Sequence, residues 1–92
     1  MEITDIKLRK YFTEGPLEAI YSITFDNELA LHDVKLVKRE DGYMVVMPNR
    51  KLANGLFKDI VHPINSVFRD RISSQIVNFH KNSVSNNEIP SN

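Results

Sequence analysis

The residues from Leu17 to Phe25 alternate between apolar and polar, and this pattern constrains the fold more than any other feature of the chain. An apolar residue occupies every second position, and only Ile20 interrupts the polar side. A period of two residues is typical of a β-strand that buries one face. The chain is therefore expected to contain a sheet with one buried face.

Similar strands are predicted before and after this segment. Ile3–Phe12 carries apolar and charged residues on opposite faces, and Glu14-Gly15-Pro16 behind it is a turn signal. Leu29–Val37 is predicted as the third strand. Its apolar side chains change face around His32-Asp33, which indicates either a bulge or a position at the edge of the sheet.

The next segment opens with a hairpin signal. Asp41-Gly42 favours a tight turn, and the apolar run Tyr43–Met47 after it predicts a central strand that is covered on both faces. Residues 49–56 are predicted as a loop. Phe57–Val61 is predicted as a short fifth strand, which ends at His62-Pro63 because proline cannot donate to a ladder.

A helix is predicted after Pro63, with Asn65 or Ser66 as its N-cap. Four apolar residues fall on one stripe of this helix, namely Phe68, Ile72, Ile76 and Phe79. Residues 82–92 are polar and of low complexity, which predicts a disordered tail. The expected organisation is a single domain at residues 1–81 followed by this tail at 82–92.

Together these elements predict an α+β fold, a small antiparallel sheet of four to five strands with one C-terminal helix. One helix can cover only one face of such a sheet. A strand that is apolar on both sides, as predicted for Tyr43–Met47, then needs a second cover. A homodimer is therefore expected, in which a second subunit provides that cover.

Composition excludes several classes of site. The 92 residues include no cysteine, so disulfides, thiolate catalysis and cysteine-based zinc sites are excluded. The N-terminal residues do not resemble a signal peptide, and no apolar run approaches the ~20 residues of a membrane span. A cytoplasmic protein without membrane contact is therefore expected.

The sequence gives little support to enzymatic chemistry. His32 beside Asp33 and Asp59 near His62 resemble catalytic dyads. No glycine-rich phosphate loop, nucleophile motif or metal-ligand spacing accompanies them. We expect structural histidines, no catalytic or metal-binding residues, no cofactor and no small-molecule substrate.

Charge is unevenly distributed along the chain, although the formal net charge is zero. Residues 1–49 contain six basic and nine acidic side chains, whereas residues 50–81 contain six basic and only two acidic ones. The basic residues of the second region are Arg50, Lys51, Lys58, Arg69, Arg71 and Lys81. If the helix packs beside the loop, they form one patch that suits phosphate groups. A solvated helix face and an acidic protein partner are the alternatives.

Two stretches between the predicted fourth strand and the helix are more specific. They read M-P-N-R-K (Met47–Lys51) and F-K-D-I-V-H-P-I-N-S (Phe57–Ser66). They resemble the motifs M-P-S-K-R and F-R-D-I-A-H-P-I-N-S of the stage V sporulation protein G (SpoVG) family. Met1–Lys10 resembles the family's M-x-V-T-D-V-R-L-R-x opening, and Ser22–Asp26 and Leu31–Val34 resemble its S-I-T-L-D and V-H-D-I segments. The likeness extends over about residues 1–80.

This resemblance implies a small antiparallel sheet with a C-terminal helix, assembled as a homodimer. It also implies a bacterial cytoplasmic regulator linked to sporulation, septation and wider gene control, in a family whose members bind DNA and in some cases RNA. By position, Arg50 and Lys51 occupy the family's K-R pair and Lys58 the arginine of F-R-D-I. Arg69 lies at a variable helix position that is often basic. The loop Leu52–Leu56 departs from the family, because it is more apolar than the usual T-P-D-G-E type.

The preferred interpretation is a homodimeric DNA-binding regulator, with RNA as a further partner. Its phosphate contacts are expected from Arg50, Lys51, Lys58, Arg69 and Arg71. The alternative is a protein-interaction module that acts on the cell-division or sporulation machinery. Its surface would be the apolar loop Leu52–Leu56 or a free sheet edge. In neither case is an enzyme expected.

Overall fold

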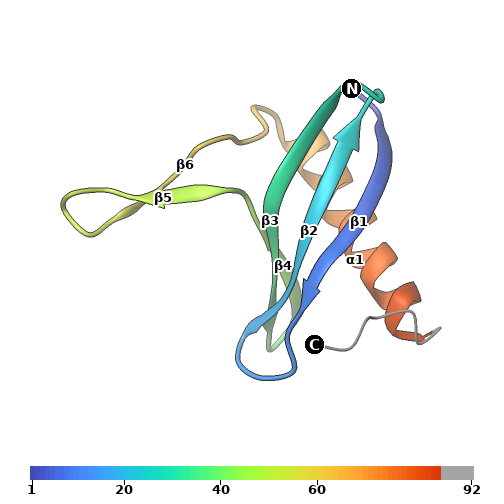
Figure 1. The fold of residues 1–92 in the computed structure, drawn as a ribbon, viewed down its shortest axis with the longest axis horizontal. Coiled ribbons are helices and arrows are strands. Elements are labelled where there is room, and N and C mark those ends of the chain that lie inside the picture. Colours follow the sequence, from blue (N-terminus) through green and yellow to red (C-terminus); the bar gives the residue numbers. More distant parts are fainter. Residues whose placement is uncertain (86–92) are drawn as a thin grey trace.

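The structure, a computed structural model, describes residues 1–85 as a sheet, a projecting hairpin and one helix (Figure 1). The sheet contains four strands, β1 (Ile3–Tyr11), β2 (Leu17–Phe25), β3 (Leu29–Arg39) and β4 (Gly42–Val46). The hairpin pairs β5 (Asn49–Lys51) with β6 (Phe57–Asp59), and α1 (Ser66–Ser85) follows. The predicted α+β fold is confirmed.

The four strands of the sheet form an antiparallel meander in the order β1-β2-β3-β4. The register between β2 and β3 shifts between Tyr21 and Ile23, opposite the place where Asp33 adopts a φ of 60°. The change of face predicted at His32-Asp33 is therefore a bulge. It is not an edge position, because β3 lies between β2 and β4.

The fourth strand differs from its prediction. β4 is an edge strand that pairs only with β3, so the expectation of a central strand at Tyr43–Met47 is wrong. The reason lies in the chain path: the chain leaves the sheet after Val46 and enters the separate hairpin. Tyr43 and Val45 pack half-buried against the core, whereas Met44 is exposed.

The segment predicted as a loop at 49–56 contains β5, so that prediction is wrong for Asn49–Lys51. Asn54 shapes the turn, since its side-chain oxygen accepts the backbone N–H of Leu56 at 3.0 Å. β6 ends at Asp59, two residues before the predicted end. We call residues 49–59 the arm; it extends from the sheet and away from α1 (Figure 1).

The helix α1 covers one face of the sheet and begins at its predicted N-cap. Asn65 caps it, because its side-chain oxygen accepts the backbone N–H of Phe68 at 2.7 Å. Helix side chains, inward residues of β2 and β3, and Met47 after β4 form the core, which comprises Ala19, Tyr21, Ile23, Phe25, Val34, Leu36, Met47, Ile72 and Ile76. In Figure 1 α1 lies behind the sheet, and no element of residues 1–85 covers the other face.

The helix extends past the predicted domain boundary at residue 81. It continues to Ser85, and Ser83 is buried on the same stripe as Ile72 and Ile76. Residues 82–85, predicted as part of the disordered tail, are therefore helical. The remainder of that tail, residues 86–92, lies outside the described residues.

Candidate functional site

Three of the five predicted phosphate-binding residues lie on the arm. The register places Arg50 directly opposite Lys58, and Lys51 opposite Phe57 on the other face of the ribbon. All three basic side chains are exposed. Within residues 1–85 no carboxylate oxygen lies within 4 Å of the charged nitrogens of Arg50, Lys51 or Lys58, although the arm carries one carboxylate, Asp59, opposite Asn49. Like charges directly opposite in a ladder are destabilising, so the fold tolerates repulsion here.

The other two predicted residues lie in the first turns of α1 and bind the protein's own backbone. Arg69 Nη2 donates to the carbonyl oxygen of Pro63 at 3.4 Å, and Arg71 Nη1 donates to that of Met1 at 2.9 Å. The Arg71 guanidinium also stacks over the Phe68 ring, 5.5 Å from its centroid. Because the arm extends away from α1, the five residues form two separate groups within one copy of the chain. Their role in binding remains a prediction.

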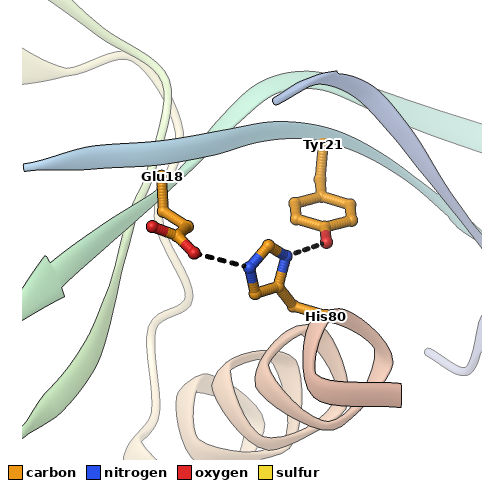
Figure 2. A network of polar contacts seen from close by, with 3 residues as sticks. All are labelled: Glu18, Tyr21 and His80. Carbon is orange, nitrogen blue, oxygen red and sulfur yellow. Dashed lines mark hydrogen bonds and ion pairs between the residues drawn. The ribbon is translucent and has the colours of Figure 1, made fainter. Parts of the chain in front are cut away.

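A buried polar cluster, which the sequence analysis missed, joins β2 to α1. Figure 2 shows the His80 imidazole between the Glu18 carboxylate and the Tyr21 phenol. His80 Nδ1 lies 2.6 Å from the Tyr21 hydroxyl, and His80 Nε2 lies 3.1 Å from Glu18 Oε2. An ionised carboxylate only accepts, so Nε2–H donates to Glu18 and the Tyr21 O–H donates to Nδ1. The spacing of His80, four residues after Ile76, was the available signal for its burial.

The geometry of this cluster indicates a structural role. Tyr21 and His80 are completely buried, so no ligand reaches them. Burial, with the nearby Glu18 carboxylate and then Tyr43, raises the pKa of the Tyr21 phenol well above its usual value. The same kind of causes, burial first and then Glu18, raise the pKa of Tyr43. The register shift between Leu17 and Ala19 turns Glu18 toward the helix, as bulges often re-aim a side chain.

The two histidines of the predicted dyads have other partners. His32 Nδ1 lies 2.8 Å from the Ser22 hydroxyl, and His62 Nδ1 lies 3.1 Å from the carbonyl oxygen of Pro63. Neither makes a hydrogen bond to Asp33 or Asp59 in the described part of the chain. Residues 1–85 also contain no group of three metal-ligating side chains.

Comparison with known families settles the membership of the chain. The SpoVG family model matches residues 1–82, which include the whole sheet, the arm and most of α1. The chain belongs to the SpoVG family. Relatives named "Putative septation protein SpoVG" include those of Clostridium acetobutylicum, 48% identical over 84% of this chain and 81% of the relative, and Clostridium novyi, 45% identical over 96% and 91%. The relative from Thermoanaerobacter pseudethanolicus is 49% identical over 84% of each chain.

Membership in the SpoVG family supports a role related to septation and sporulation. The structure also shows which contacts the residues of the SpoVG motifs make. Pro48 accepts the backbone N–H of Ile60 at 2.8 Å and so closes the base of the arm, while Asn65 caps the helix. The motifs therefore contain the residues that close the base of the arm and cap α1. None of the described helices is long and apolar enough to cross a membrane.

The SpoVG-like chain also exposes apolar side chains along the arm and the linker that follows it. In residues 1–85, six of the ten well-exposed large apolar residues lie between 56 and 67, namely Leu56, Phe57, Ile60, Val61, Ile64 and Val67. A small apolar hollow of about 160 Å³ lies beside this linker, with walls that include Leu29, Val61 and Phe68. Such a concentration of exposed apolar surface is typical of an interaction site.

Proposed function

We propose that this member of the SpoVG family is a homodimeric regulator that acts in septation and sporulation by binding DNA through the arm. The observation that carries this proposal is the placement of Arg50 opposite Lys58, with neither side chain in an ion pair within residues 1–85. Repulsion between them costs stability in the free protein. Phosphate groups relieve that repulsion when they bind, and counterion release adds to the affinity.

The shape of the arm suits duplex DNA. The major groove of B-DNA is about 12 Å wide and admits a two-stranded β-ribbon. The arm is such a ribbon, and it presents Arg50 and Lys58 on one face and Lys51 on the other. Cations on both faces reach the phosphates on both sides of a groove. Arg69 and Arg71, at the start of α1, form a second basic group that supplies further phosphate contacts.

The arm also supports a homodimer. A two-stranded hairpin by itself is marginally stable in water, and this one exposes Leu56 and Phe57 at 64% and 69%. A second copy that packs against these side chains buries them and stabilises the arm. Dimer formation also places two sets of basic residues in one particle, which strengthens binding to a polyanion.

The DNA-binding proposal is tested by fluorescence anisotropy with a labelled duplex at several salt concentrations. Arg50→Ala with Lys51→Ala is expected to weaken binding to all sequences and to reduce the slope of log K against log salt by about 1.8, since each phosphate that the protein neutralises contributes ~0.9 to that slope. The matched control is Lys38→Ala with Lys81→Ala, which removes the same charge from exposed positions elsewhere. Equal affinities for the two double variants would exclude the arm as the DNA site.

The dimer is tested by light scattering coupled to gel filtration. Phe57→Ser is expected to convert dimer to monomer, whereas Val84→Ser, at an exposed site on α1, leaves the dimer intact. A monomeric wild-type protein at micromolar concentration would contradict the proposal.

The exposed arm tip also supports a second candidate function, a protein-interaction module of the division or sporulation machinery. The two functions differ in salt dependence. A partner protein retained on the immobilised chain after nuclease treatment and a high-salt wash, and released by Phe57→Ser, favours this second function.

A further inference from the structure

The charges of residues 1–49 separate by structural element. All six basic residues of this region lie on β1 or β3, at positions 7, 9, 10, 35, 38 and 39. Six of its nine acidic residues lie outside the strands, at positions 2, 14, 26, 28, 40 and 41. The net charge of −3 in this half of the chain is therefore the sum of strands rich in basic residues and turns rich in acidic residues.

The strand register places most of these basic residues on the face that α1 does not cover. Lys7 pairs with Ser22, Lys10 pairs with Ile20, and Lys35 pairs with both Ile20 and Val46. Arg39 shares the face of Lys35, and its Nη1 contacts the Met44 sulfur at 3.0 Å. We call this side of the sheet the open face; its residues include Asp5, Lys7, Arg9, Lys10, Ile20, Ser22, Thr24, Lys35, Val37, Arg39 and Val46.

Arg9 of the open face is held in place by a buried neighbour, Ser22. Arg9 Nε donates to the Ser22 hydroxyl at 2.9 Å, and that hydroxyl lies 2.8 Å from His32 Nδ1. Ser22 is only 7% exposed, so the hydroxyl is a fixed acceptor in the floor of the face. Because Nε is occupied, the terminal nitrogens of Arg9 remain available to a ligand. A pre-organised guanidinium loses less entropy when it binds a phosphate.

The cations of the open face form two rows. β1 carries Lys7, Arg9 and Lys10, and β3 carries Lys35 and Arg39. The rows are separated by two strand spacings, about 10 Å. Between them β2 contributes an uncharged stripe of Ile20, Ser22 and Thr24. The register places Asp5 on this face, and Asp33 lies opposite Ser22 in the bulge of β3, but no Lys or Arg of residues 1–85 is in an ion pair.

From this arrangement we propose that the open face binds single-stranded nucleic acid, with the strand lying along β2 between the two rows of cations. The proposal rests on the nucleic-acid function proposed above and adds a second surface with a different ligand. A four-stranded sheet is too wide to enter a groove that admits only a two-stranded ribbon, so duplex does not suit this face. An uncharged floor flanked by cations suits one strand, whose phosphates face the rows.

Binding at the open face is expected to be independent of sequence. The aromatic side chains within the strands, such as Tyr21 and Tyr43, pack on the side of α1, so none of these offers a base-stacking platform on the open face. The ring of Phe12, just past β1, is covered by the Lys10 ammonium, which lies 5.1 Å from its centroid. The contacts are therefore with phosphates, which DNA and RNA share. Affinities for oligothymidylate and oligouridylate are expected to lie within about threefold of each other.

The test is anisotropy with labelled oligothymidylate and oligouridylate of about 20 nucleotides, beside a duplex of the same length. Lys10→Ala with Lys35→Ala is expected to weaken single-strand binding about three- to tenfold and to reduce the salt slope by about 1.4. The same variant leaves duplex binding unchanged. The matched control, Lys38→Ala with Lys81→Ala, leaves single-strand binding unchanged, because neither residue lies on the open face.

The positioning role of Ser22 has its own readout. Ser22→Ala is expected to lower single-strand affinity about threefold in the wild-type background and to have no effect in an Arg9→Ala background. Thr24→Ala, on the same stripe, is the control. Equal effects of Ser22→Ala with and without Arg9 would contradict the role.

The outcomes separate this inference from the DNA function of the arm. A protein that binds duplex through Arg50 and Lys51 but does not bind the single strands refutes the open-face proposal alone. The open-face proposal is also refuted if the Lys10/Lys35 variant and its control weaken single-strand binding equally. A protein that binds neither ligand refutes both proposals.

Discussion

Removal of one hydroxyl group, that of Tyr21, tests how much the buried cluster stabilises the fold. Tyr21→Phe keeps the buried ring and removes the donor that lies 2.6 Å from His80 Nδ1. His80 is completely buried, so no water replaces the missing partner. A change of tautomer does not help, because the Glu18 carboxylate needs the Nε2–H.

The expected cost follows from this geometry. A buried acceptor left without a donor costs about 1–3 kcal/mol. In a domain of this size each kcal/mol lowers the melting temperature by about 4–8 °C. Tyr21→Phe is therefore expected to melt at least about 4 °C below the wild type, and more if the cluster cannot relax.

The assay is thermal and urea unfolding followed by circular dichroism, with Tyr43→Phe as the matched control. The Tyr43 ring also packs edge-on against His80, at 5.5 Å between centroids, but its hydroxyl makes no hydrogen bond within residues 1–85. Tyr43→Phe is expected to change stability by less than about 0.5 kcal/mol. Equal losses in the two variants, or a more stable Tyr21→Phe protein, would refute the assigned donor and acceptor.

Two further predictions concern alkaline pH and the helix cap. Because burial raises the pKa of Tyr21 above its usual value near 10, the unfolded chain loses this proton first. The contribution of this proton to the free energy of unfolding is thus fully present below about pH 10. Above that pH the free energy of unfolding falls, by up to ~1.4 kcal/mol per pH unit. Urea unfolding across this range should show a shallower fall in Tyr21→Phe; parallel profiles would contradict the assignment. Asn65→Ala removes the cap of α1 and should cost about 1 kcal/mol in the same assay, whereas Asn65→Ser should cost much less. Exposed Asn78→Ala is the control, and an equal loss there would argue against the cap.

Local sequence patterns predicted most of the sheet. They did not predict the pairing of β5 with β6 or the burial of polar groups such as His80. β1, β2 and β3 have the alternation that a half-buried strand requires, and the bulge at Asp33 follows from the change of face. β5 has no such pattern, since Asn49–Lys51 becomes a strand only because β6 pairs with it. His80 was missed because its burial depends on Glu18 and Tyr21, which are about sixty residues away in sequence.

The candidate surfaces also differ in whether the sequence alone could identify them. Counting charges along the chain identified Arg50, Lys51 and Lys58, which are neighbours in sequence and in the arm. The same count assigned the first half of the chain an acidic character, because it combined turn carboxylates with strand cations. In a strand successive side chains point to opposite faces, so the charge of a surface is set by register and not by segment. A net charge of zero is therefore compatible with two basic surfaces, because six of the twelve carboxylates lie before or between the strands of the sheet and not on them.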